Sequence, residues 1–383
     1  MIYFDNAATT RPDENCIKQA EKYLLQDFYN PSALYGGGHK ISLDLKQAVS
    51  NILSTIADLN NFSLIFTSCG TEADNQAIFC GGKRGNVVTT LGEHSAINSS
   101  VNELKQRGIE IRFANLNSDG SVNVEHLLSL VDAKTSLVSV IHVNNETGAI
   151  NDINDIAKRI KAKNQYTLFH SDGVQAYGKI PFKLSKDIDL YSVSAHKIGG
   201  LKGCGALIKR KNLVLKPFVY GGGQQQGLRS GTENVFGIKC FEYASISHYA
   251  KIEESYEKIS RIKELISSQL DKDLFKIISP ECGTPYILTV SAVGLRGETI
   301  LHEADDSGLI IGTGSACSSN ANKRYSRIIL SCGYDENTAD GVLRLSFSPE
   351  NTLDEAQEAV KILNTIVKHR KEVMEYYGKS HYN

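Results

Sequence analysis

The residue of this sequence with the clearest chemical potential is a lysine that follows an apolar run. Lys197 closes the string Ser194-Ala195-His196-Lys197, and a pair of glycines comes two residues later. Lysine is seldom fully buried without a function, and its amine can attack a carbonyl carbon to form a Schiff base. The sequence therefore predicts covalent chemistry with a carbonyl group at Lys197.

Polar residues also follow four other short apolar runs. Alone, a histidine or an aspartate in such a place is more often a loop or cap residue, so only the whole set argues for a site. The four strings are Thr67-Ser68-Cys69-Gly70-Thr71-Glu72, Glu93-His94-Ser95, Val143-Asn144-Asn145-Glu146 and Ser171-Asp172-Gly173-Val174-Gln175. They supply carboxylates, an imidazole, amides and hydroxyls, which can surround one lysine if the runs are strands of one sheet.

Pyridoxal phosphate (PLP) is the cofactor that uses a lysine in this way, and it needs four further contacts. Asp172 can pair with the pyridinium nitrogen, His94 can cover the ring, and Gln175 with Asn145 can donate to the phenolic oxygen. A small, hydroxyl-rich loop before a predicted helix suits the phosphate, because free N–H groups and the helix dipole attract an anion. The predicted phosphate contacts are Ser68, Cys69, Gly70, Thr71, Ser194 and His196. The sequence has neither a Walker loop nor a Gly-x-Gly-x-x-Gly fingerprint, so this phosphate need not belong to a nucleotide.

These loops need a scaffold that brings strand ends together. Between residues 60 and 210, short β-branched or aromatic runs alternate with polar stretches. This alternation is typical of an α/β fold with a mostly parallel sheet between two layers of helices. In such a sheet the ligand lies at the carboxyl ends of the strands. The seven predicted strands are 62–67, 86–90, 109–114, 135–142, 166–171, 188–194 and 205–209.

The pattern changes after residue 234. Ile252, Tyr256 and Ile259 recur at helical spacing, which predicts a long helix that can bridge two domains. Thr352 and Glu355 have the spacing of a capping box at the start of a final helix. Shorter strands are predicted at 275–279, 287–292 and 342–347. We expect a large PLP-binding α/β domain over residues 12–255 and a smaller α+β domain formed by residues 1–11 and 256–383.

Composition limits the classes of function. The 42 Lys and Arg against 43 Asp and Glu leave a net charge of −1, which argues against nucleic acid or a membrane surface as a partner. No apolar run approaches the roughly 18 residues that span a bilayer, and the first residues do not resemble a signal peptide, so we expect a cytoplasmic protein. Eight cysteines without a Cys-x-x-Cys pair argue against a disulfide framework and a zinc site. We therefore expect reduced thiols and no metal.

Taken together, the strings resemble those of the NifS/IscS-like cysteine desulfurases, which are fold-type I PLP enzymes of the class V aminotransferase family. The resemblance runs nearly from end to end of the chain. Its motifs are Asp5-Asn6-Ala7-Ala8-Thr9-Thr10, Asn30-Pro31-Ser32, Gly70-Thr71-Glu72-Ala73-Asp74-Asn75, Glu93-His94, Asn144-Asn145-Glu146-Thr147-Gly148, Asp172-Gly173-Val174-Gln175, His196-Lys197, Gly221-Gly222-Gly223-Gln224, Arg229-Ser230-Gly231-Thr232-Glu233-Asn234 and Gly314-Ser315-Ala316-Cys317-Ser318-Ser319.

The resemblance implies three catalytic residues. Lys197 would hold PLP and take the α-proton of L-cysteine, and His94 would stack on the ring and assist proton transfer. Cys317 would attack the sulfur of the substrate, which leaves L-alanine and a persulfide on Cys317. A sulfur-acceptor protein, either an iron–sulfur scaffold or a thiolation enzyme, would then collect the sulfur.

The resemblance also implies the residues that hold cofactor and substrate. The implied cofactor contacts are Lys197, Asp172, Gln175, His94, Gly70, Thr71, Ser194, His196 and Asn145, with Thr232 reaching in from the second subunit of a homodimer. The implied substrate contacts are Arg344, Asn145, Asn30 and Ala8. Arg344 would clamp the substrate carboxylate, because its planar group suits bidentate binding. The chain departs from the usual family pattern at Tyr35, Tyr220, Gln225, Gln226 and Ser348, and none of these positions is catalytic.

Two other functions remain open from the sequence. A selenocysteine lyase, an aminotransferase or another fold-type I lyase would also use Lys197 and PLP, but would not need the thiol of Cys317. A non-catalytic sulfur-relay or scaffold protein would have kept the fold without the chemistry, and the intact set around Lys197 argues against it.

Overall fold

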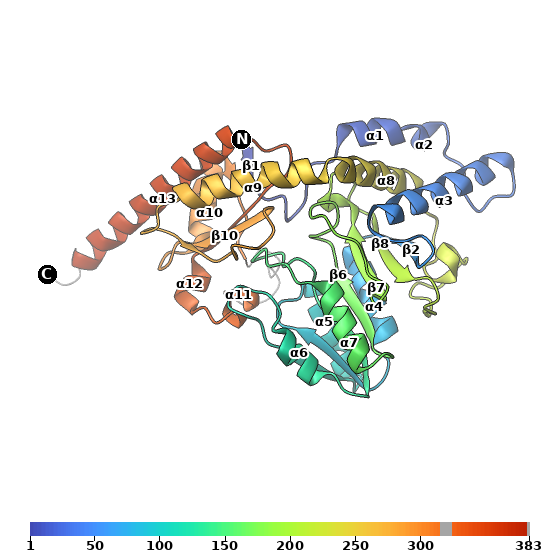
Figure 1. The fold of residues 1–383 in the computed structure, drawn as a ribbon. Coiled ribbons are helices and arrows are strands. Elements are labelled where there is room, and N and C mark those ends of the chain that lie inside the picture. The colour runs from blue at the N-terminus through green and yellow to red at the C-terminus, as the bar shows by residue number, and fades with distance from the viewer. Residues whose placement is uncertain (315–323, 381–383) are drawn as a thin grey trace.

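A seven-stranded sheet forms the centre of the larger part of the molecule (Figure 1). The computed structural model describes residues 1–314 and 324–380. The strand order is β2-β8-β7-β6-β5-β3-β4, in which β8 is antiparallel to both neighbours and the other pairs are parallel. The strands are β2 (Phe62–Thr67), β3 (Asn86–Thr90), β4 (Glu110–Ala114), β5 (Thr135–Ser139), β6 (Leu168–Asp172), β7 (Leu190–Ser194) and β8 (Gly205–Arg210). All seven predicted strands are confirmed: β2 and β3 have the predicted bounds, and the ends of the other five differ by at most three residues.

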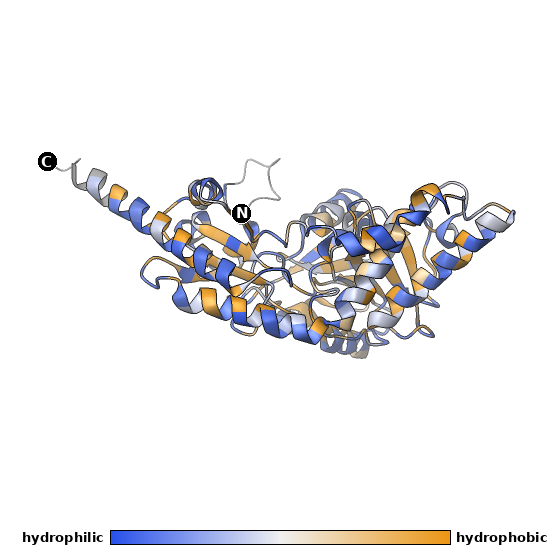
Figure 2. Ribbon diagram, turned by 90° about the horizontal axis from the view of Figure 1, so that it is seen from above, coloured by the Kyte–Doolittle hydropathy of each residue, from blue (hydrophilic) through white to orange (hydrophobic). Residues whose placement is uncertain are grey.

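Helices cover both faces of this sheet. Leu64 and Phe66 of β2 pack into the core under one layer, whereas Ile65 between them packs under the other. Because both faces are buried, the strands are continuous apolar runs rather than alternating ones. Figure 2 shows these apolar strands (orange) between helices that carry both hydrophobic (orange) and hydrophilic (blue) residues. One layer contains α1 (Glu14–Ala20), α2 (Lys22–Leu25), α3 (Gly36–Ile56), α6 (Val124–Leu130), α7 (Ile153–Lys163) and α8 (Val235–Ala250), and the other contains α4 (Gly70–Gly81) and α5 (Ser95–Gln106).

The smaller part has a core of its own around a three-stranded antiparallel sheet. The start of the chain belongs to it, because β1 (Ile2–Tyr3) pairs with β11 (Leu309–Ile310) and Phe4 is fully buried in this core. Its other elements are β9 (Lys276–Ile277), β10 (Ile287–Ser291), β12 (Val342–Ser346), α9 (Ile252–Gln269), α10 (Gly297–Asp306), α11 (Arg327–Ser331), α12 (Glu336–Asp340) and α13 (Leu353–Ser380). From the two separate cores we propose the domain division expected from the sequence, residues 12–255 against 1–11 and 256–383.

The helix signals in the second half of the sequence are confirmed. The helical pattern from Ile252 lies in α9, which runs between the two parts in Figure 1. At the start of α13, Thr352 N donates to Glu355 Oε2 at 3.0 Å and Glu355 N donates to Thr352 Oγ1 at 3.2 Å, which is the predicted capping box. The sequence analysis did not predict α3, whose first three residues are glycines.

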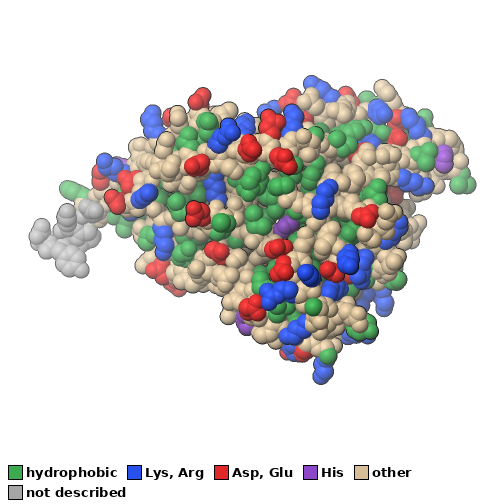
Figure 3. Space-filling view, in the orientation of Figure 1, with side chains coloured by type: hydrophobic (Ala, Val, Ile, Leu, Met, Phe, Trp, Pro, Cys, Tyr) green, Lys and Arg blue, Asp and Glu red, His purple; other side chains and the backbone are tan. Residues whose placement is uncertain are grey.

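The surface agrees with the balanced charge of the sequence. Figure 3 shows Lys and Arg side chains interspersed with Asp and Glu over one face of the molecule. Among the described residues, no helix combines the length and the apolar character needed to cross a membrane.

One glycine has a specific role in the sheet. A Cβ atom on Gly173, directly after β6, would lie 1.9 Å from Cζ of Tyr191, whose ring is fully buried in β7. The ring has little room to move, because Tyr191 Oη also contacts His142 Nδ1 at 2.9 Å. Gly173 therefore lets the chain turn from β6 into the loop that carries Gln175.

We predict that Gly173→Ala lowers the free energy of unfolding by about 3 kcal/mol, at the upper end of the usual cost of overpacking. Urea unfolding followed by circular dichroism measures this loss. Gly36→Ala is the matched control, because a Cβ on Gly36 meets nothing within 4 Å, and we expect it to change stability by less than about 0.5 kcal/mol. Equal stability of the two variants would contradict the close packing of Gly173 on Tyr191.

Candidate active site

A cavity of about 290 Å³ lies where the loops after the parallel strands meet. Most of the residues singled out in the sequence line it, although they come from loops spread over the chain. These are Ala8, Gly70, Thr71, His94, Asn145, Asp172, Gln175, Ser194, His196, Lys197 and Arg344. The expected convergence at the carboxyl ends of the strands is therefore present.

Lys197 reaches the cavity from a short 3₁₀ turn, Ala195–Lys197, that directly follows β7. Its Nζ donates to the carbonyl oxygens of Ala7 at 2.6 Å and Ala8 at 2.7 Å. The segment that accepts these bonds is itself tied to the smaller domain, since Ala7 N donates to Ser346 Oγ at 2.8 Å. Backbone oxygens of the N-terminal segment thus hold the amine at the cavity.

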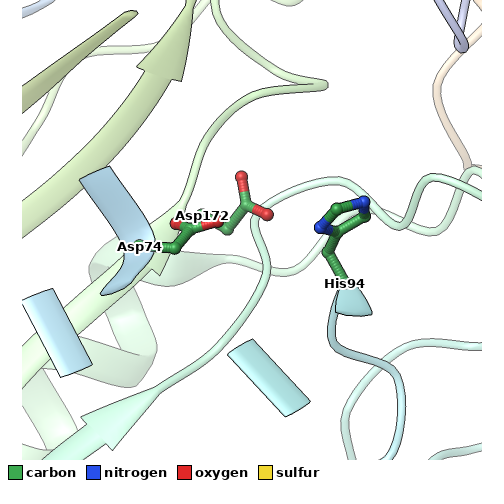
Figure 4. A group of neighbouring side chains, drawn as sticks. All are labelled: Asp74, His94 and Asp172. Atoms are coloured by element: carbon green, nitrogen blue, oxygen red, sulfur yellow. The ribbon is translucent and has the colours of Figure 1, made fainter. Parts of the chain in front are cut away.

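Two buried carboxylates lie next to each other beside the cavity. Figure 4 shows Asp74, from α4, next to Asp172 at the end of β6, with the ring of His94 opposite. One carboxylate oxygen of each aspartate and one ring nitrogen of His94 lie within 4.8 Å of one another. Burial raises the pKa of Asp74 well above its usual range, and the charge of Asp172 raises it further. Burial also raises the pKa of Asp172, but His94, the N–H of Val174 and Lys197 oppose this rise.

The surroundings thus favour the protonated form of Asp74 more strongly than that of Asp172. Asp172 accepts a hydrogen bond from Val174 N at 2.9 Å, which favours its charged form. A carboxylate at this place suits the ring nitrogen of PLP, which stays protonated beside an anion. The three groups are also close enough to share a metal ion, but a metal needs deprotonated ligands and the raised pKa of Asp74 opposes that form.

His94 is held in one orientation at the start of α5. Its Nδ1 accepts a hydrogen bond from Ala96 N at 3.2 Å, so the proton of the neutral ring lies on Nε2. Burial lowers the pKa of His94, and the nearby charges of Lys197 and Arg327 lower it further, whereas Asp172 raises it. His94 is therefore a neutral imidazole at pH 7, able to lie against an aromatic ring and to exchange a proton at Nε2.

The N-terminus of α4 fits a phosphate group. The side chain of Cys69, the residue before α4, makes no capping hydrogen bond. The first N–H groups of α4 therefore lack a side-chain acceptor from this residue. A Cβ on Gly70 would lie 2.7 Å from Val174 Cγ2 and 3.4 Å from Ser194 Cβ, so glycine keeps this corner open. The buried Ser194 Oγ has no hydrogen-bond partner among the described residues. A phosphate oxygen would satisfy both the hydroxyl and the helix N–H groups.

The opposite end of the cavity is formed by a buried arginine. Arg344 of β12 is only 4% exposed. Its guanidinium donates to Asn145 O at 2.9 Å and to Asp5 Oδ1 at 2.8 Å. Arg344 Nε and Asn145 Oδ1 are buried and lack a partner within the described part of the chain. These two atoms are suited to a small ligand with a carboxylate and a polar group.

Three of the predicted site residues that the structure describes do not line this cavity: Ser68, Asn30 and Thr232. The N–H and hydroxyl of Ser68 donate to Glu72 Oε2. Asn30 and Thr232 are exposed, and the Asn30 side chain accepts a hydrogen bond from Ser32 N at 2.9 Å. The predicted residue Cys317 lies outside the described residues. The assignments of these four residues remain predictions.

The structure also places residues in the site that the sequence analysis did not assign. Asp5 pairs with Arg344, and Asp74 stands beside Asp172, although both lie in strings that the resemblance rests on. Glu146 is buried against Ser326, whose hydroxyl donates to its carboxylate, and burial raises the pKa of Glu146 to about 7. No local signal marks such residues, because their partners are more than 90 positions away in the sequence.

Comparison with known proteins agrees with this site. The sequence model of the family described as Aminotransferase class-V matches residues 2–358. The chain is 33% identical to "Cysteine desulfurase IscS" of Clostridium botulinum, over 97% of this chain and 96% of that protein. It is 34% identical to "NifS/IcsS protein homolog" of Lactobacillus delbrueckii, over 96% and 98% of the two chains.

Solved structures give the same result. A structure titled "NIFS-LIKE PROTEIN" superimposes with a TM-score of 0.90 at 31% identity, over 96% of this chain and 99% of the other. A second, "SspA in complex with cysteine", has a TM-score of 0.79 at 25% identity, over 92% and 100% of the two chains. With the residues that converge in the cavity, these similarities show that the chain belongs to the class-V aminotransferase family and, within it, to the NifS/IscS-like cysteine desulfurases.

Proposed function

We propose that this protein is a PLP-dependent cysteine desulfurase in which Cys317 receives the sulfur of L-cysteine. The observation that carries the proposal is the convergence of Lys197, Asp172, His94 and Arg344 on one cavity. An amine, a buried anion, a neutral imidazole and a carboxylate-binding arginine are the groups that an amino-acid-processing PLP site needs.

Each end of the cavity has a defined task in this proposal. PLP bound through Lys197 would supply an electron sink for the negative charge that develops at the substrate Cα. Asp172 would hold the ring nitrogen, and Gln175 would donate to the phenolic oxygen. The phosphate would lie at the start of α4, with Gly70, Thr71, Ser194 and His196. Asn145 and Arg344 would bind the substrate carboxylate and so orient the Cα–H bond toward Lys197.

Proton transfers then fall to two residues of the chain. Lys197 Nζ would remove the α-proton, since its amine is held at the cavity by the carbonyl oxygens of Ala7 and Ala8. His94 Nε2 carries the exchangeable proton of a neutral ring. Cys317, as a thiolate, would attack the substrate sulfur. The new sulfur–sulfur bond forms while the bond between the substrate Cβ and its sulfur breaks. The substrate Cβ then takes up a proton and becomes the methyl group of alanine.

We further propose a homodimer in the cytoplasm whose persulfide is passed to an acceptor protein. The exposure of Thr232 supports the dimer, because a residue that completes the site of a second subunit must be exposed in its own chain. Large apolar side chains are exposed near Asn30, among them Phe28 at 67% and Leu34 at 103%, and a second subunit would cover them.

We predict that Cys317→Ala lowers the release of alanine and sulfide from L-cysteine by roughly 100-fold or more, because it removes the attacking thiol. The visible absorption of bound PLP should remain. Cys282→Ala is the matched control, because Cys282 is an exposed free cysteine, and it should keep wild-type activity. A fully active Cys317→Ala would point to a PLP lyase that does not use this thiol, and a wild-type protein without PLP absorption would point to a non-catalytic relay.

We also predict opposite outcomes for the two neighbouring carboxyl groups. Asp172→Asn removes the anion beside the ring nitrogen and should lower kcat by roughly 100-fold or more, whereas Asp74→Asn replaces a neutral acid with a neutral amide and should change kcat by less than about threefold. Steady-state alanine formation and the PLP absorption spectrum measure both variants. If Asp74→Asn were as damaging as Asp172→Asn, Asp74 would have to be charged.

A further inference from the structure

A buried lysine that the proposed mechanism does not use lies directly behind the cavity. Lys179 is 3% exposed and follows the loop after β6. Its Nζ donates to Oε1 of Gln175 at 2.8 Å, one helical turn earlier in the chain. Buried lysines are rare in proteins, and this one contacts a residue assigned to the phenolic oxygen of PLP rather than a carboxylate.

The two neighbours of Gln175 leave only one orientation for its amide group. Nε2 of Gln175 donates to the carbonyl oxygen of Ala7 at 2.8 Å. A carbonyl oxygen can only accept a hydrogen bond, and the lysine amine donates one, so the amide nitrogen must face Ala7 and the amide oxygen must face Lys179. The reversed amide would set two acceptors against each other at Ala7. An amide nitrogen has a second hydrogen, which is available to a ligand oxygen in the cavity.

The charge state of Lys179 does not alter this orientation. Burial lowers its pKa well below the usual range, and the positive charges of Lys197 and Arg344 lower it further. A neutral amine still carries two N–H groups, so it donates to Gln175 Oε1 in either form. Hydrogen bonds in a chain polarise one another, and a donor on Oε1 therefore strengthens the N–H groups of the same amide.

We infer that Lys179 is a positioning residue, which holds the Gln175 amide with its donor toward the phenolic oxygen of PLP. The inference rests on the proposed function, in which PLP occupies the cavity and Gln175 contacts that oxygen. Lys179 itself lies outside the set of residues that line this cavity and lines a neighbouring one of about 240 Å³. Its effect on the cofactor must therefore pass through Gln175.

The test is a pH titration of the visible absorption band of the holoenzyme, without substrate. A donor on the phenolic oxygen stabilises the more negative, high-pH form of the cofactor, so weakening that donor raises the midpoint of the titration. We expect Lys179→Met to raise the midpoint by about half to one pH unit, the size of one hydrogen bond. Lys179→Arg keeps an N–H donor and should restore most of the wild-type midpoint.

Two further comparisons separate positioning from other effects. Lys209→Met is the matched control, because Lys209 is 5% exposed and its amine donates to the backbone oxygens of residues 210, 211 and 213. It should leave the midpoint unchanged. In a Gln175→Leu background, the loss of Lys179 should no longer move the midpoint, because the two residues act as one unit.

Each outcome has a definite meaning. If the wild type shows no PLP absorption, the proposed function fails before Lys179 is tested. If the wild type binds PLP and Lys179→Met shifts the midpoint equally with and without Gln175, the lysine acts through its charge alone and the inference is wrong. It is also wrong if Lys179→Met leaves the midpoint unchanged, whatever the stability of the variant.

Discussion

The burial of the Arg344 guanidinium is the constraint on which the rest of the site depends. A buried charge that loses its partners costs several kcal/mol, so the groups that bind it must stay in place. The guanidinium donates to Asp5 near the start of the chain and to Asn145 after β5, and the backbone of Arg344 pairs in both directions with that of Gly312. This one residue therefore joins the N-terminal segment and the smaller domain to the loop that follows β5.

Several polar atoms around the cavity are buried without a partner in the described part of the chain. Ser194 Oγ lies at the proposed phosphate end, and Asn145 Oδ1 and Arg344 Nε lie at the proposed substrate end. An unsatisfied buried polar group costs about 1–3 kcal/mol, and a bound ligand that supplies the missing hydrogen bonds would recover that cost. The fold thus provides an arrangement of polar groups that PLP and an amino-acid carboxylate would complete.

The fold was largely predictable from local patterns. The seven strands are apolar runs because helices bury both of their faces, and the capping box of α13 needs only residues 352–355. The helix α3 was not predictable in the same way. It begins with three glycines, and close packing explains their presence: a Cβ on Gly37 would lie 2.6 Å from the ring of Tyr29. Such contacts between loop and helix leave no periodic pattern in the sequence.

The sequence by itself determined which chemical groups the protein offers: Lys197, Asp172 and His94 stand out because each follows a predicted strand in a string of small or polar residues. The tertiary structure alone decided their states. The pKa of Asp74 is raised because folding buries it beside Asp172, and the Gln175 amide has one orientation because Ala7 and Lys179 lie on its two sides. Charge and orientation depend on burial and on neighbours from other elements, and such neighbours are fixed only when the chain has folded.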